Sequence, residues 1–167
     1  MERRDVLAMV VLAGATVAAS GRRVQGAEAC PPADAAAGAS ATLLERYAAA
    51  VNAHDTSSFP ELFTDTYIQH SGRSPSGLAA QIENFRRIFT TMPDVRMRVE
   101  DRIIAGDRVV ARTTYSATHT RPIRGVPPTG KPFSFRTIDI WRVENGKFAE
   151  HWDLTDAGEV VRRLGGQ

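Results

Sequence analysis

The residues best suited to proton transfer lie close together near the C-terminal end of the chain. Asp139 falls in an alternating segment, residues 133–143, and His151 and Asp153 fall in the next one, residues 148–154. The Asn-Gly dipeptide between the segments predicts a β-hairpin. Two carboxylates and a histidine on one partly dry face shift each other's pKa values, because burial and like charge raise a carboxyl pKa and a protonated histidine lowers it. Such a group can move protons near neutral pH.

The register of this hairpin decides which of these side chains meet. A two-residue turn would pair Glu144 with Lys147, set Asp139 opposite Trp152 and put Asp153 on the other face. A slip of one residue inverts every side chain.

A three-residue loop with its glycine in the left-handed conformation is the alternative that we favour. It pairs Val143 with Lys147, so that Asp139 faces His151. One face then carries Asp139, Trp141, His151 and Asp153. The opposite face gathers the apolar side chains of Ile138, Ile140, Phe148 and Trp152.

Other polar and aromatic residues of the predicted strands are candidates for the same site. His119 ends a strand on the alternating face of Tyr115, where it could orient a carbonyl or shuttle a proton. His70 follows a short strand and could reach the mouth of a pocket. Arg112 either contacts a ligand oxygen or neutralises the acidic pair, and Trp141 either lines the pocket or packs beneath it. We therefore expect four catalytic candidates, Asp153, Asp139, His119 and His70. The expected substrate-binding candidates are His151, Trp141, Tyr115 and Arg112.

No metal or cofactor is expected. The four histidines include no pair spaced two or four residues apart, and a single cysteine cannot build a thiolate site. No glycine-rich phosphate loop follows a strand, and no serine sits in a nucleophile elbow.

The elements that must position these residues are helices first and strands afterwards. Apolar spacing predicts helices over residues 40–54, 58–63 and 76–89, with a short strand at residues 67–70. From Val95 the period changes to two, which predicts strands over residues 95–100, 109–119, 133–143 and 148–154, then a helix over residues 159–164. The expected class is α+β, with a curved antiparallel sheet wrapped around the N-terminal helices as a cone with one open pocket.

The N-terminal segment has the pattern of an export signal. Arg3-Arg4 precedes an uncharged stretch too short to span a membrane, and Ala27-Glu28-Ala29 supplies a cleavage pattern. The twin arginines favour the export route for folded proteins. The expected organisation is an export signal at residues 1–29, a flexible linker at residues 30–40 and one domain at residues 41–167.

Composition and charge limit the kinds of binding partner that fit this chain. The net charge is +2 without a block of like charges, which argues against nucleic acid and favours a small hydrophobic ligand. We expect a periplasmic or secreted protein with no integral membrane segment once the signal is removed. Cys30 directly follows the cleavage pattern, where a lipid anchor could be attached. We treat this anchor as the less favoured alternative.

Successive short motifs resemble those of the SnoaL-like polyketide cyclases, or ester cyclases. They are residues 47–55, Tyr67-Ile68-Gln69-His70, Met92-Pro93-Asp94-Val95, residues 106–112, Thr118-His119-Thr120, residues 127–131, Asn145-Gly146-Lys147 and His151-Trp152-Asp153. The resemblance implies the cone fold of nuclear-transport-factor-type proteins, often dimeric, and catalysis without metal or cofactor. It also implies that Asp153 matches the aspartate that serves as general acid/base in an intramolecular aldol ring closure, while Asp139 stands where the cyclases carry a histidine.

Two functions follow as hypotheses. The first is a cofactor-independent cyclase, isomerase or hydrolase acting on a small hydrophobic carbonyl compound. The alternative is an exported protein that binds a hydrophobic small molecule without converting it. In either case the apolar outer face of the sheet predicts a homodimer.

Overall fold

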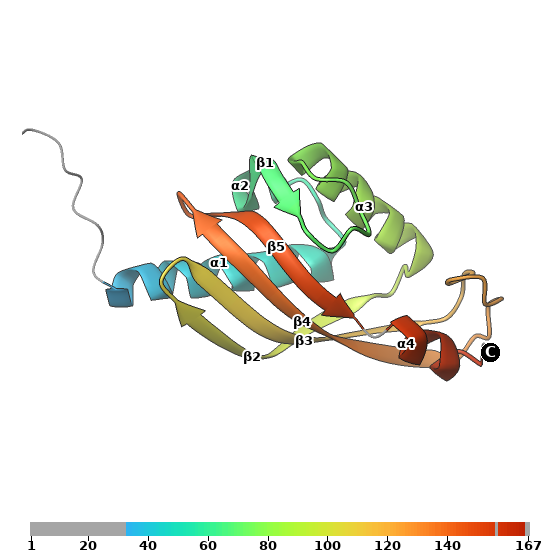
Figure 1. Ribbon diagram of the computed structural model, residues 1–167. Coiled ribbons are helices and arrows are strands. Elements are labelled where there is room, and N and C mark those ends of the chain that lie inside the picture. The colour runs from blue at the N-terminus through green and yellow to red at the C-terminus, as the bar shows by residue number, and fades with distance from the viewer. Residues whose placement is uncertain (1–32, 156, 166–167) are drawn as a thin grey trace, which may run out of the picture. The chain divides into compact units, whose positions relative to one another are not determined.

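The structure, a computed structural model, describes residues 33–155 and 157–165. Its elements are α1 (Ala33–Ala53), α2 (Phe59–Leu62), β1 (Phe63–Gln69), α3 (Leu78–Thr91), β2 (Arg96–Ala105), β3 (Arg108–Thr118), β4 (Pro132–Glu144), β5 (Lys147–Thr155) and α4 (Ala157–Arg163) (Figure 1). Helices followed by long strands confirm the predicted α+β class. The predicted export signal and Cys30 lie outside the described residues. Within the described part, each helix is too short or too polar to cross a membrane.

The five strands form one curved, unclosed sheet in the order β1-β5-β4-β3-β2 (Figure 1). Strands β2 to β5 pair antiparallel, as expected. Strand β1 instead runs parallel to β5, so the expectation of a wholly antiparallel sheet is corrected at this edge. The chain passes through α3 and three more strands between β1 and β5, and only so long a connection can join parallel neighbours.

Helix α1 begins earlier than the sequence predicts. Residues 33–40, expected as part of a flexible linker, belong to α1, and Ser40, the expected cap, is buried inside it. Alanine dominates this segment and has the highest helix propensity, while the one glycine costs only about 1 kcal/mol. The structure therefore replaces the predicted linker by helix from Ala33 onward.

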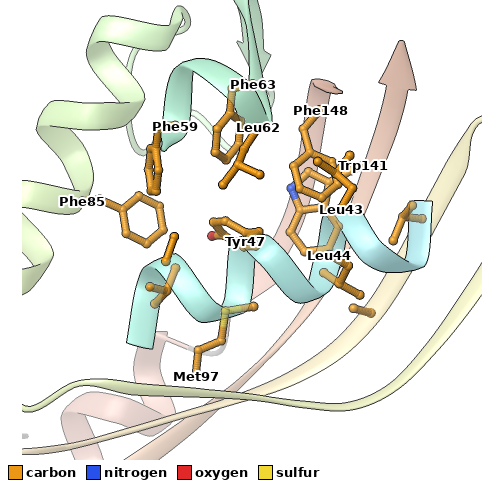
Figure 2. Packing of buried hydrophobic residues seen from close by; sticks show 14 of the residues in the cluster. Leu43, Leu44, Tyr47, Phe59, Leu62, Phe63, Phe85, Met97, Trp141 and Phe148 are labelled. Atoms are coloured by element: carbon orange, nitrogen blue, oxygen red, sulfur yellow. The ribbon is translucent and has the colours of Figure 1, made fainter. Parts of the chain in front are cut away.

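Tyr47 of α1 is the centre of the main hydrophobic core (Figure 2). Its ring meets other aromatic rings edge to face, at centroid distances of 5.7, 5.9, 5.9 and 5.8 Å for Phe63, Phe85, Trp141 and Phe148. Each such pair contributes about 0.5–1.5 kcal/mol beyond the area that it buries. Since these rings come from β1, α3, β4 and β5, one side chain ties the helices to the inner face of the sheet.

The outer face of the sheet carries a row of apolar side chains. Ile103, Val110, Ile140 and Trp152 are successive partners across β2, β3, β4 and β5. Leu154 beside them is 75% exposed. We call this set the outer apolar row. Phe148, which the sequence places on this face, is instead fully buried in the core.

We expect the outer apolar row to join two copies of the chain, because monomers rarely leave such a patch open. A chain of residues 31–167, one compact unit, should then sediment as a dimer at micromolar concentration. Ile140→Lys should shift it to the monomer with little change in melting temperature, since Ile140 is 37% exposed. Ala79→Lys, on the exposed side of α3, is the matched control and should remain dimeric. A wild-type monomer in analytical ultracentrifugation would contradict this expectation.

Candidate functional site

The hairpin of β4 and β5 combines a two-residue turn with a β-bulge. Asn145 and Gly146 have positive φ angles of 50° and 73°, as a type I′ turn requires, and Glu144 pairs with Lys147. One extra residue in β5, Ala149, then shifts the register between the strands.

The bulge brings the four expected side chains to one face, although not in the expected pairs. Beyond the bulge Asp139 lies opposite Asp153, and Trp141 lies opposite His151. The predicted three-residue loop, with Asp139 opposite His151, is therefore wrong, whereas the shared face is confirmed. Because the bulge reverses the alternation of β5, Phe148 also points inward and fills the core.

Asp139 is buried and both of its carboxylate oxygens are hydrogen-bonded. Its side chain is 5% exposed. Thr137 donates its hydroxyl to Oδ2 at 2.5 Å, and Oδ1 lies 3.1 Å from Nε2 of His151. The His151 ring stacks on Trp141 with 4.9 Å between centroids, which fixes its plane. This carboxylate is thus fully engaged within the protein.

Gln69 of β1 sets the tautomer of His151. Its Oε1 accepts the backbone N–H of Ser71 at 3.1 Å, which turns its amide NH₂ toward Nδ1 of His151 at 2.9 Å. Nδ1 must accept that hydrogen bond, so the ring proton is assigned to Nε2, where it is donated to Asp139.

Asp153 has different partners from Asp139. Its Oδ2 forms an ion pair with Arg73, in the loop between β1 and α3, and lies 3.4 Å from the hydroxyl of Thr155. Its Oδ1 is buried and has no hydrogen-bond partner among the residues that the structure describes. A buried oxygen left without a partner is costly. This atom is therefore the best placed to meet a bound molecule.

Three tyrosines surround Asp139 from the core side. Burial raises the pKa values of Tyr47, Tyr67 and Tyr115, and the charge of Asp139 raises them further. Since ionisation is suppressed, Tyr115 is a neutral hydrogen-bond donor on the wall of the site throughout the neutral pH range.

These side chains line a cavity of about 470 Å³ between α3 and the inner face of the sheet. Its apolar wall includes Tyr47, Phe85, Ile88, Met92, Tyr115, Ile123, Phe133, Phe135 and Val160. Its polar wall includes Gln69, Ser71, Arg73, Ser74, Gln81, Asn84, Arg87, Arg124, Thr137, Asp139, His151, Asp153 and Thr155. The volume suits a small organic molecule. In the described part of the chain, no three histidine, cysteine or carboxylate side chains are grouped closely enough to hold a metal ion.

Two of the predicted site residues lie on the outer face of the sheet. His70 lies 2.8 Å from the carboxylate of Glu150 and stacks on Trp152. Arg112 donates to Asp101 through two nitrogens at 3.0 and 2.7 Å. Neither lines the cavity. The structure therefore places His70 and Arg112 away from the cavity, on the opposite side of the sheet from the inner face, and gives no support to a catalytic His70 or a ligand-binding Arg112.

Two further candidates are buried behind the cavity wall. His119 is fully buried, with Nδ1 3.1 Å from the hydroxyl of Thr129, in the smaller core around Phe133. Trp141 lies under His151 and supports it. Neither lines the cavity, whereas Tyr115, His151 and the two aspartates do.

Sequence reasoning missed most of the polar wall, including Gln69, Arg73 and Gln81. For Gln69 a signal existed, since the alternation from buried Tyr67 places Gln69, and not His70, on the inner face. For Gln81 the helical spacing to Phe85 was the signal. Arg73 lies in a loop, where no periodic pattern applies.

The fold and the inward-facing carboxylates define a small α+β domain with a polar-ended cavity, and comparison identifies its family. The family model described as SnoaL-like polyketide cyclase matches residues 41–164, and the chain belongs to this family. A search of curated proteins gave no significant match.

Solved structures agree with this assignment. TsrD from Streptomyces laurentii is 32% identical with a TM-score of 0.73, covering 78% of this chain and 97% of that one. AclR from Streptomyces galilaeus, described as a candidate hydroxylase, is 27% identical with a TM-score of 0.70, covering 78% and 87%. IdmH from Streptomyces antibioticus, described as a candidate polyketide cyclase, is 26% identical with a TM-score of 0.67, covering 75% and 98%.

The role of Gln69 can be tested by the protonation of His151. We expect long-range ¹⁵N–¹H NMR spectra to show a ring proton on Nε2 and none on Nδ1. Gln69→Glu would replace the donor at Nδ1 by an acceptor, so Nδ1 should carry a proton in that variant. Gln81→Glu, on the same cavity wall but not in contact with the ring, is the control and should leave the spectrum unchanged. A proton on Nδ1 in the wild type, or equal effects of the two variants, would contradict the assignment.

Proposed function

We propose that this protein is a cofactor-independent acid/base enzyme of the polyketide-cyclase type, which closes a ring in a small hydrophobic carbonyl compound. The observation that carries the proposal is the unpartnered Oδ1 of Asp153, buried on the cavity wall opposite Asp139. Membership of the SnoaL-like family and the position of Asp153 within His151-Trp152-Asp153 support the same role.

In this proposal Asp153 is the base. Arg73 forms an ion pair with its other oxygen, Oδ2, and leaves Oδ1 unpaired. Oδ1 takes a proton from a carbon next to a carbonyl group, and the resulting enolate attacks a second carbonyl carbon of the same molecule. A carbon–carbon bond forms, and the proton returns to the new alkoxide oxygen. The reaction is balanced without oxidant or co-substrate.

The remaining wall supplies stabilisation and positioning. Tyr115 is a neutral donor that can hydrogen-bond to the oxygen on which negative charge develops. Asp139 and His151 hold each other, and Asp139 faces Asp153 across the hairpin. Since both oxygens of Asp139 are engaged, Asp153 retains the free oxygen.

Binding without turnover is the second candidate. It is favoured by the fixed state of Asp139 and His151, because every polar atom of that pair already has a partner within the protein. Such a cavity would hold a hydrophobic molecule without a second group ready to transfer a proton.

Asp153→Asn separates the two candidates. A ligand is first found by thermal-shift screening of polycyclic ketones, lactones and terpenoids, and its conversion is followed by mass spectrometry. The amide keeps the size of Asp153 but cannot accept the proton, so turnover should fall by about 10²-fold or more while binding is retained. Asp107→Asn, in the exposed turn between β2 and β3, is the control and should keep the wild-type rate. An unchanged rate in Asp153→Asn would refute the catalytic role, and ligands that bind but are never converted would favour the binding protein.

A further inference from the structure

The polar residues of the cavity wall differ in burial, and two of the buried ones carry a hydrogen-bond acceptor without a partner. Gln81 is 3% exposed and the side chain of Asp153 is 5% exposed. Both line the cavity, and Oε1 of Gln81 and Oδ1 of Asp153 are buried without a partner in the described part of the chain. Unpaired buried acceptors are rare. A ligand that fits them carries a hydrogen-bond donor at its inner end, such as a hydroxyl group for Gln81 or the enol form of the reacting carbonyl group for Asp153.

The outer group consists of arginines. Arg73, Arg87 and Arg124 line the cavity and are all exposed, so they lie at its rim. Arg73 is paired with Asp153, and Arg87 donates to the neutral amide oxygen of Asn84 at 2.7 Å. Within residues 33–155 and 157–165, neither Arg87 nor Arg124 has a carboxylate partner, so two positive charges at the rim are not balanced.

Arg124 is held in an unfavourable backbone conformation. It has a φ of 48° and precedes Gly125 in a tight turn closed by hydrogen bonds between Ile123 and Val126, at 3.1 and 2.9 Å. Positive φ suits glycine or asparagine far better than arginine. Strain of this kind of about 1–3 kcal/mol is commonly retained at ligand sites, and here it places a guanidinium at the cavity rim.

We infer that the cavity takes an amphiphilic acid: an apolar ring system with a hydroxyl or enol at its inner end and a carboxylate or other anion at the rim. The inner end meets Gln81 and Asp153, and the anion meets Arg87 and Arg124. This orientation keeps the anion away from the two buried aspartates, whose negative charge would repel it. The inference rests on the proposed function, since it names the substrate class of the same cavity.

The test uses two fluorescent probes that differ only by an anion. 1-Anilinonaphthalene-8-sulfonate carries a sulfonate on the ring system of N-phenyl-1-naphthylamine, which is neutral. We expect the full chain to bind the sulfonate about tenfold more tightly. Each of Arg87→Gln and Arg124→Gln should weaken sulfonate binding by about threefold, a typical value for an exposed charge pair, and leave the neutral probe unchanged. Raised salt should act on the sulfonate alone.

Two controls make the outcomes distinct. Arg86→Gln removes a neighbouring arginine of α3 that does not line the cavity, and should change neither affinity. Ile88→Trp fills the cavity from its apolar wall and should weaken both probes, provided that its cooperative melting is retained. The anion preference would be overturned if the two probes bound equally well, were unaffected by Arg87→Gln and Arg124→Gln, and were both weakened by Ile88→Trp. The proposed function would then still stand. If Ile88→Trp also left the affinities of both probes unchanged, the anion preference and the proposed function would both be overturned.

Discussion

The β-bulge in β5 is the constraint on which the rest of the site depends. With the two-residue turn alone, an unbroken ladder would turn Glu150 and Trp152 inward and His151 and Asp153 outward. The extra residue Ala149 reverses the alternation after Phe148, so that Phe148 fills the core and the two polar residues still face the cavity. Only this local irregularity places both Phe148 in the core and the acid/base group on the cavity wall, and bulges of this kind are common beside active sites.

Two consequences follow on opposite sides of the sheet. On the inner side His151 stacks on Trp141, and Tyr47 packs edge to face against Trp141, so the polar chain of Gln69, His151 and Asp139 rests on the centre of the core. On the outer side the same register aligns Trp152 with Ile140 in the outer apolar row. A substitution that changed the register would thus alter the cavity and the outer surface together.

The sequence predicted the elements well because their signals are local and periodic. The helical spacing in α1 and α3 and the alternation in β2 to β5 survive in the structure, although α1 begins earlier, at Ala33, and β2 continues to Ala105. The bulge was not predicted, because sequence reasoning compared a two-residue turn with a three-residue loop. The structure instead combines the two-residue turn with a later bulge, which keeps Phe148 in the core. Arg73 and Arg124 also escaped prediction, since loop residues carry no periodic pattern and reach the cavity through tertiary packing. His70 shows the opposite error: a residue type suited to catalysis was preferred over its neighbour Gln69, which strand alternation places inside.

The central claim is that ligands bind on the inner face of the sheet, beside Asp153, and the two tryptophans of the chain can test it. Trp141 lies on the inner face beneath His151, and Trp152 lies on the outer face against His70. Titration of the ¹⁵N-labelled chain with N-phenyl-1-naphthylamine, followed by NMR, reports on both faces in one experiment. The account predicts that the indole N–H signal of Trp141 and the ring signals of His151 shift in a saturable manner while those of Trp152 and His70 stay in place. Shifts confined to Trp152 and His70 would contradict it.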